Sequence, residues 1–338
     1  MPKIPVHIIT GFLGSGKTTF LNHFIRERLP ERTFVIENEC GATNVDGGLI
    51  MEGVEEVVEL SAGCLCCSLA DGLLDILVEV GKRTGEYDRL VIETTGIADP
   101  GSIVQVFLTN PRVEEVFELE QVICLVDAGL VEEWLEEAQE ALRQVALADV
   151  LLVNKIDTVP GADSIRVGEL LKGINPNAKV LTGVQGVFPI TEILKTGTTR
   201  PEQVEAISDH GHHHHEHYHH HDESTGNSHK ITTFTLTFPY PVDLNRFHQD
   251  LNRLVMAHRN QVYRVKGFIA IPNVPIRVIL QSARSLFITT EGTPWEDAES
   301  REGKLVFIGR GLKKEVFEQM LSSYLVEPPA NPARVAYS

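Results

Sequence analysis

The chain has 338 residues, 42% hydrophobic and 23% charged, with a formal net charge of −17. This composition is typical of a globular protein, and the length leaves room for about two domains. The acidic balance disfavours nucleic acid or an anionic membrane as the main partner, because phosphate contacts need basic patches. The first residues do not resemble a signal peptide, and no apolar stretch approaches the roughly 18 residues of a membrane span. We therefore expect a cytoplasmic protein.

A glycine-rich loop, GFLGSGKT at 11–18, follows an apolar predicted strand at 4–10 and leads into a predicted helix at 17–29. It matches the pattern G-x-x-x-x-G-K-[ST], whose backbone N–H groups surround the β-phosphate of a nucleotide. Lys17 is expected to reach the β- and γ-phosphates and Thr18 to bind Mg²⁺, so both are predicted to be catalytic. A chance glycine-rich loop is disfavoured by the strand before it and the helix after it. The residues of this loop predicted to bind the nucleotide are Gly11, Gly14, Ser15, Gly16, Lys17, Thr18 and Thr19.

Three of the five cysteines gather in CLCC at 64–67, between a predicted strand at 57–60 and a predicted helix at 69–83. An odd number of cysteines makes a poor disulfide framework and suits thiolate metal ligation in a reducing compartment. Thiolates are soft ligands for Zn²⁺, Co²⁺ or Cu(I), and three of them need a fourth group around a tetrahedral ion. On spacing alone, metal ligation by Cys64, Cys66 and Cys67 and their burial as apolar side chains are equally supported.

The predicted strand at 89–93 ends in ETTG. At this position a carboxylate can hold Mg²⁺ through water, and a glycine N–H can contact the γ-phosphate. We therefore group Glu93 with the predicted catalytic residues and Gly96 with the predicted nucleotide ligands. A capping or surface charge is the competing interpretation of Glu93.

The tetrad NKID at 154–157 directly follows a predicted strand at 149–153, at the edge where open α/β sheets bind ligands. Asp157 can accept the N1–H and the exocyclic amine of guanine, whereas adenine presents an acceptor at N1 and leaves the carboxylate unsatisfied. Asn154 is expected to brace this loop, and the stem of Lys155 to cover the base plane. Together with the phosphate loop, these residues predict that the nucleotide is GTP.

Residues 1–205 alternate apolar strands with helical stretches, which predicts an α/β P-loop NTPase domain with a mostly parallel sheet. Its Cys124, His7 and His23 are expected to be packed side chains rather than metal ligands. Further strands are predicted at 33–37, 121–127 and 179–182, and further helices at 130–144 and 163–173.

Most of the histidines lie in 206–229, which has little that could enter a core and is predicted to be a His-rich flexible linker. Neutral imidazoles bind Zn²⁺, Ni²⁺ and Co²⁺, so a flexible string of them can capture metal; an inert polar linker is the alternative. The predicted ligands in this segment are His212, His213, His214, His215, His217, His219, His220 and His221.

Residues 230–326 are predicted to form a smaller α+β domain with a largely antiparallel sheet, followed by a Pro-rich tail at 327–338. Strands are expected at 231–238, 262–271, 276–281, 285–290 and 304–309, and helices at 243–257 and 312–324.

Taken together, GFLGSGKTT, VIENECG, VDGGLI, GCLCC, ETTGIADPG and NKID resemble the CobW-related P-loop GTPases, and most of all the YjiA-like subgroup. FPYPVDLNRF, YRVKGFIAI and KLVFIGRGL extend the resemblance to the C-terminal half, which implies a CobW-C-like second domain. The family consists of slow GTPases concerned with metal delivery or metallocofactor assembly, chiefly for zinc and cobalt.

The resemblance also implies site residues. Glu37 and Glu39 match carboxylates of the internal metal site, which favours metal ligation by the CLCC cysteines as well. Asp46 matches a switch aspartate near Mg²⁺ or the attacking water, with a solvated loop charge as the alternative. The family pattern N-E-F-G-E is broken by Cys40 and Ala42, and whether Cys40 replaces the missing glutamate as a ligand is left open.

The resulting prediction is a GTP-driven metallochaperone that uses GTP, Mg²⁺ and Zn²⁺, with Co²⁺ or Ni²⁺ as alternatives, and serves a client metalloprotein. No general base and no arginine finger is identifiable, so slow intrinsic hydrolysis is expected. Two alternatives are a metal buffer with a regulatory nucleotide site and a GTPase that assists assembly of a cobalt- or nickel-containing cofactor enzyme. A P-loop kinase is disfavoured by NKID. A homo-oligomer that depends on nucleotide or metal is a further open alternative.

Overall fold

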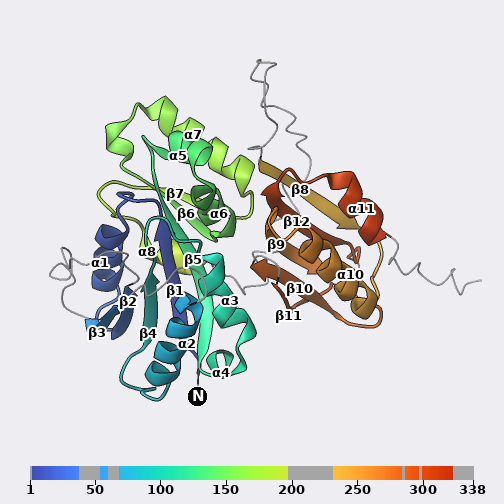
Figure 1. The fold of residues 1–338 in the computed structure, drawn as a ribbon, viewed down its shortest axis with the longest axis horizontal. Helices are drawn as coiled ribbons and strands as arrows, with labels where there is room; N and C mark the ends of the chain where they lie inside the picture. Colours follow the sequence, from blue (N-terminus) through green and yellow to red (C-terminus); the bar gives the residue numbers. More distant parts are fainter. Residues whose placement is uncertain are drawn as a thin grey trace, which may run out of the picture. The chain divides into compact units, whose positions relative to one another are not determined.

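The computed structural model describes residues 2–37, 54–59, 68–196, 231–283, 286–296 and 299–322. The chain divides into two compact units, Met1–Thr199 and Arg200–Ser338 (Figure 1). Within the described ranges, no helix is both long and apolar enough to cross a membrane. The predicted domain boundaries at 205 and 230 fall outside the described residues and stay predictions.

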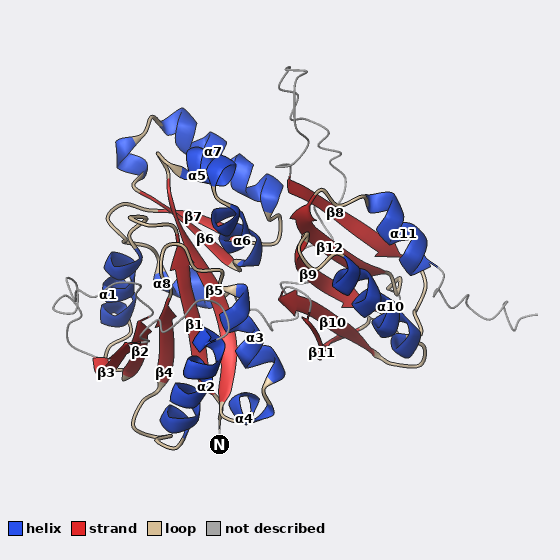
Figure 2. Ribbon diagram, viewed as in Figure 1, coloured by secondary structure: helices blue, strands red, loops and turns tan. Residues whose placement is uncertain are grey.

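The first unit is built on a seven-stranded sheet with the strand order β3-β2-β4-β1-β5-β6-β7. Its strand pairings are parallel, and Figure 2 shows helices on both sides of the sheet. An inner strand such as β6 is buried along its whole length because both of its faces are covered. The strands are β1 (Ile4–Gly11), β2 (Thr33–Glu37), β3 (Val54–Glu59), β4 (Arg89–Glu93), β5 (Phe117–Asp127), β6 (Val150–Asn154) and β7 (Lys179–Thr182).

Helix α1 follows β1 and packs Phe20, Leu21 and Phe24 into a core cluster with apolar residues of β1, β5 and β6. The short helix α8 covers the same cluster with Ile190 and Ile193. The helices of this unit are α1 (Lys17–Glu27), α2 (Ser68–Gly81), α3 (Gly101–Thr109), α4 (Pro111–Glu114), α5 (Val131–Glu137), α6 (Gln139–Leu147), the 3₁₀ turn η1 (Ile156–Thr158), α7 (Gly161–Ile174) and α8 (Ile190–Leu194).

The predicted single helix at 130–144 is wrong, because α5 and α6 are separate helices that part at Ala138, whose backbone is extended. The apolar spacing continues through this residue, so the local pattern gives no sign of the break. The two helices have different tertiary partners: α5 contacts the loop after β1, and α6 contacts the loop after β4. Tertiary contacts therefore override the local helical period at this point.

Two other parts of this unit differ from expectation. Strand β5 begins at Phe117 instead of residue 121, and its early residues pair with β1 across a bulge at Glu120. Helices α3, α4 and α8 were not predicted, although the apolar side chains of Ile103, Val104 and Phe107 are buried in α3. The α/β fold with a parallel sheet is confirmed.

The second unit has a five-stranded antiparallel sheet with the order β11-β10-β9-β12-β8. Helices α10 and α11 bury Phe247, Leu251 and Phe317 in a core cluster with one face of this sheet, where Phe307 stacks on Phe234. The predicted small α+β fold is confirmed. The elements are β8 (Ile231–Phe238), α10 (Leu244–Ala257), β9 (Val262–Ile269), β10 (Ile276–Ala283), β11 (Leu286–Pro294), β12 (Gly303–Arg310) and α11 (Lys314–Ser322).

Candidate functional site

The glycine-rich loop lies between the end of β1 and the start of α1, so the first-turn N–H groups of an eleven-residue helix face the loop. Gly16 precedes the helix with φ 99°, and a Cβ there would lie 2.5 Å from Asn154 Nδ2. Only glycine fits this conformation and this space. The buried hydroxyl of Ser15 has no hydrogen-bond partner among the described residues, as expected of a loop shaped for an anion.

Lys17 and Thr18 take up positions that suit a bound Mg²⁺–nucleotide. The Lys17 ammonium donates to the Phe12 carbonyl at 3.3 Å, across the loop. The Thr18 hydroxyl donates to Glu93 Oε1 at 2.9 Å. Two predicted Mg²⁺ ligands that are 75 positions apart in the chain are therefore in direct contact. A hydroxyl and a carboxylate are hard oxygen donors of the kind that Mg²⁺ prefers, so these residues fit the ion.

The loop after β4 lies against the phosphate loop. A Cβ at Gly96 would be 2.6 Å from the Leu13 backbone nitrogen, so this close approach requires glycine. No hydrogen bond within the described residues uses the Gly96 N–H.

Helix α6 stabilises the loop after β4 through side-chain hydrogen bonds that the sequence did not predict. The buried Gln144 donates through Nε2 to the carbonyls of Gly96 at 3.1 Å and Ala98 at 3.0 Å. The neighbouring Arg143 pairs with Asp99 at 3.3 Å. Gln144 has no motif around it, and only its place in the folded chain identifies it.

Asn154 joins two loops at the end of β6. Its side chain is buried, donates to the Ser15 carbonyl at 2.9 Å and accepts from the Gly186 N–H at 3.0 Å. This is the bracing expected from the sequence. Asp157, three residues further along the chain, is exposed, and its carboxylate makes no hydrogen bond or ion pair within the part of the chain that the structure describes. A carboxylate in this position is accessible to the base of a bound nucleotide.

Lys155 is the backbone outlier of this region. It has φ 60°, and its ammonium lies 2.8 Å from Asp127 Oδ2 at the end of β5. Sequence reasoning did not include Asp127. The signal that could have found it is its position as a carboxylate ending the strand next to β6.

Glu37 is the one predicted zinc ligand that the structure describes. It ends β2, and its register partners are Glu59 at the end of β3 and Glu93 at the end of β4. Within the described ranges, no cluster of three or more potential metal ligands forms. The predicted residues Glu39, Asp46, Cys64, Cys66, Cys67, His212, His213, His214, His215, His217, His219, His220 and His221, and the open case of Cys40, lie outside the described residues and stay predictions.

Three side chains expected to be packed are indeed packed. Burial raises the pKa of the Cys124 thiol to about 12, which keeps it protonated and a poor metal ligand. His23 Nε2 bonds the Phe188 carbonyl at 2.9 Å. His7 is fully buried in β1 beside the ring of Phe24.

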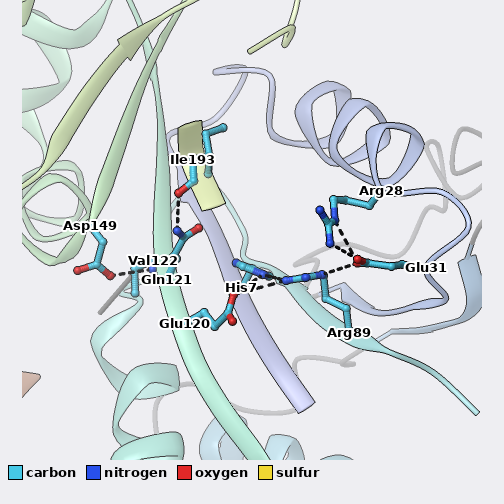
Figure 3. A network of polar contacts seen from close by, with 9 residues as sticks. All are labelled: His7, Arg28, Glu31, Arg89, Glu120, Gln121, Val122, Asp149 and Ile193. Carbon is cyan, nitrogen blue, oxygen red and sulfur yellow. Dashed lines mark hydrogen bonds and ion pairs between the residues drawn. The ribbon is translucent and has the colours of Figure 1, made fainter. Parts of the chain in front are cut away.

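His7 belongs to a network of charged side chains away from the loops (Figure 3). Its Nε2 bonds Arg89, which also pairs with Glu31 at 3.2 Å and Glu120 at 3.6 Å. Burial, and then the charge of Arg89, hold the pKa of His7 well below its usual value. His7 is therefore a neutral structural residue.

A glycine-rich loop at a strand–helix junction, a hydroxyl–carboxylate pair beside it and an NKxD loop two strands away define a P-loop nucleotide-binding protein of the GTPase class. Residues 5–182 match the family model "CobW/HypB/UreG, nucleotide-binding domain", and residues 231–325 match "Cobalamin synthesis protein cobW C-terminal domain". The chain belongs to this CobW family of GTPases, as the sequence motifs predicted.

Named relatives agree. The chain is 34% identical to "Zinc chaperone YjiA" of Escherichia coli over 93% of this chain and 96% of that protein. It is 31% identical to "Zinc chaperone CobW" of Pseudomonas aeruginosa over 96% of this chain and 92% of that protein. The crystal structure of Zn(II)-bound YjiA GTPase from E. coli superposes with a TM-score of 0.68 at 29% sequence identity. The match covers 96% of this chain and 100% of that one.

Proposed function

We propose that this protein binds and slowly hydrolyses GTP and uses that cycle to bind zinc and hand it to a client protein or cofactor pathway. Relatives that match almost the whole chain are named zinc chaperones, and one was crystallised with Zn(II). Cobalt is the alternative cargo. The observation that carries the proposal is the register of Glu37 with Glu93 on neighbouring strands.

This register links the two predicted ion sites. Neighbouring strands lie about 4.8 Å apart, so the last residue of β2 and the last residue of β4 are adjacent. Glu93 already accepts from Thr18, the predicted Mg²⁺ ligand, while Glu37 is itself a predicted zinc ligand and is followed two residues later by Glu39, another one. A change at Glu93 when Mg²⁺–GTP replaces Mg²⁺–GDP would therefore reach the zinc site through one strand pair. Different zinc affinities in the two states would make turnover release the ion.

The site residues have these roles in the proposal. Lys17 and the loop N–H groups bind the phosphates, and Thr18 and Glu93 hold Mg²⁺, which supplies charge stabilisation for phosphoryl transfer. The Gly96 N–H contacts the γ-phosphate, and Asp157 reads the guanine edge. No described residue acts as a general base.

The cellular setting is also part of the proposal. We place the protein in the cytoplasm, where thiolates stay reduced and available for zinc. Its partner is a client metalloprotein that accepts the ion. A homo-oligomer that forms with nucleotide or metal is compatible with this scheme and is tested by mass measurement in each nucleotide state.

A zinc titration in two nucleotide states tests the proposal. We expect the purified protein to bind zinc with affinities that differ at least fivefold between a non-hydrolysable GTP analogue and GDP, since coupling energies of about 1–3 kcal/mol are typical. Cys66→Ala should abolish the tight site. Cys124→Ala, which changes a buried packed thiol, is the matched control and should leave zinc binding unchanged. Equal zinc affinity in both states would refute the switch.

The metal-buffer alternative rests on the histidine segment. Deletion of 206–229 would remove most zinc capacity from a buffer, whereas a chaperone would keep one tight site and its GTPase activity. Zinc stoichiometry by competition with a chromophoric chelator distinguishes the two.

A further inference from the structure

We propose that Asp127 is a positioning residue that fixes Lys155 against the guanine base and so sets the affinity and selectivity for guanine nucleotides. This inference rests on the proposed guanine-nucleotide function and deepens it. Asp127 lies outside the loop motifs that define the site, and its role follows from its contacts.

The strand ends put Asp127 within reach of the base-binding loop. Asp127 is the last residue of β5, and its register partner is Asn154, the last residue of β6. Lys155 follows Asn154 directly, so the carboxylate and the ammonium leave neighbouring strands at the same edge of the sheet. Their distance is 2.8 Å.

The carboxylate of Asp127 is held at both oxygens. Oδ2 accepts from the Lys155 ammonium, and Oδ1 accepts from the Gly129 N–H at 2.9 Å. Its side chain is only 6% exposed, so water cannot replace the ammonium effectively. Removal of the ammonium would leave the charge of this buried carboxylate without its counter-ion, which costs more than the loss of an exposed ion pair.

The backbone of Lys155 indicates that its orientation matters. Its φ of 60° and ψ of 32° are left-handed, a conformation that is unfavourable for a residue with a Cβ. Such strain persists where the surroundings fix the residue, and it clusters at ligand sites. Here the preceding residue, Asn154, is held by its hydrogen bonds with Ser15 and Gly186, while Asp127 holds the far end of the Lys155 side chain.

The side chain between these two anchors is available to a ligand. The Lys155 side chain is 39% exposed even though its ammonium is paired, and Asp157, two residues further along the chain, is exposed as well. An apolar stem held at both ends presents a fixed surface for one face of a planar base. With the base held in that plane, its Watson–Crick edge meets Asp157. Without the anchor at Asp127, the stem is free to rotate and that alignment is lost.

The alternative is that the pair only stabilises the loop. If the role were merely structural, loss of the pair would lower the melting temperature and weaken the binding of all nucleotides alike. A positioning role raises KM for GTP without changing kcat, because the phosphates and Mg²⁺ are bound elsewhere. It also leaves the KM for ATP, which we expect to be higher than that for GTP, nearly unchanged, so the preference for GTP over ATP falls.

The test uses the full-length protein and steady-state kinetics with GTP and with ATP. In Asp127→Asn the side chain keeps an oxygen that can accept from Gly129 but loses its charge. We expect KM for GTP to rise about tenfold, the equivalent of about 1.4 kcal/mol, with kcat within about twofold of wild type. Lys155→Met keeps an apolar stem but loses its anchor, and should give the same change. The double variant should be no worse than either single variant.

Glu132→Gln is the matched control, because Glu132 makes an exposed ion pair with Arg166 at 3.2 Å on the same unit. It should leave KM for both nucleotides unchanged. An unchanged GTP KM in Asp127→Asn, equal losses for GTP and ATP, or additive effects in the double variant would each overturn the proposal. If Asp127→Asn does not fold, Lys155→Met alone decides. Wild-type protein without a preference for GTP would instead overturn the guanine function itself.

Discussion

His7 shows how burial decides the chemistry of a single residue. It sits in β1 with Arg89 on one neighbouring strand and Glu120 on the other, and Arg28 and Glu31 complete the charged surroundings. Glu120 lies 3.4 Å away but is 32% exposed, so solvent screens it and it does not offset burial and Arg89. A histidine in such a place stays neutral in the folded chain.

This buried histidine predicts a specific loss of stability in acid. The unfolded chain takes up a proton on His7 below pH about 6.5, while the folded chain resists it, so the free energy of unfolding falls as pH drops below that value. We expect a slope of up to about 1.4 kcal/mol per pH unit between pH 6.5 and 5 from this residue. In His7→Gln the slope should be shallower. Urea unfolding in a Trp295→Phe background, followed by the fluorescence of Trp134, measures the first unit alone.

The control for that measurement is His248→Gln in α10, since this side chain belongs to the second unit. It should leave the pH dependence of the first unit unchanged. An identical slope in wild type and His7→Gln would contradict the prediction.

At the scale of elements, α6 supports the nucleotide site without contributing to any motif. Through Gln144 it holds the two carbonyls that flank Ile97 in the loop after β4, which fixes the Gly96 N–H beside the phosphate loop. We predict that Gln144→Ala lowers kcat for GTP several-fold, because loss of a buried hydrogen-bond donor loosens this loop. GDP affinity should stay within about twofold, because GDP has no γ-phosphate to contact. Stopped-flow binding of fluorescent GDP and single-turnover hydrolysis measure the two effects.

Gln139→Ala is the comparison for that variant, since Gln139 is an exposed residue of the same helix. It should leave both measurements unchanged. If Gln144→Ala weakened GDP binding as much as it slowed GTP hydrolysis, α6 would support the domain in general rather than the loop after β4 in particular.

The sequence predicts the site where function is encoded in short motifs. The phosphate loop, Glu93 and NKID were found because each combines a strand end with residues of fixed chemistry. Both folds were predicted for the same reason, from periodicity that is local. Gln144 was missed because a glutamine in an amphipathic helix carries no distinguishing local pattern. Asp127 was missed because its place at the end of a strand gains meaning only once that strand is known to lie next to β6, whose end leads into NKID. The break at Ala138 was missed because the apolar period runs through it.

At the scale of the whole molecule, the proposed Mg²⁺–nucleotide site and the proposed zinc site are coupled through the end of the β2–β4 strand pair. Thermodynamic linkage gives this idea a strict consequence. If a GTP analogue changes the zinc dissociation constant by some factor, zinc must change the dissociation constant of the analogue by the same factor. The factor has to be found in both titrations, whatever route the coupling takes.

The route itself is tested by Glu37→Gln, which keeps the shape of the side chain but removes its charge beside Glu93. We expect this variant to bind zinc more weakly and to bring the linkage factor close to one, because the neutral amide no longer responds to the charge change around Glu93. Glu118→Gln, an exposed residue of β5, is the matched control and should keep the full factor. Calorimetric titration of zinc with and without analogue, and of analogue with and without zinc, gives all four constants. A variant that binds zinc weakly but retains the full factor would show that the coupling runs through the cysteine segment instead of the β2–β4 pair.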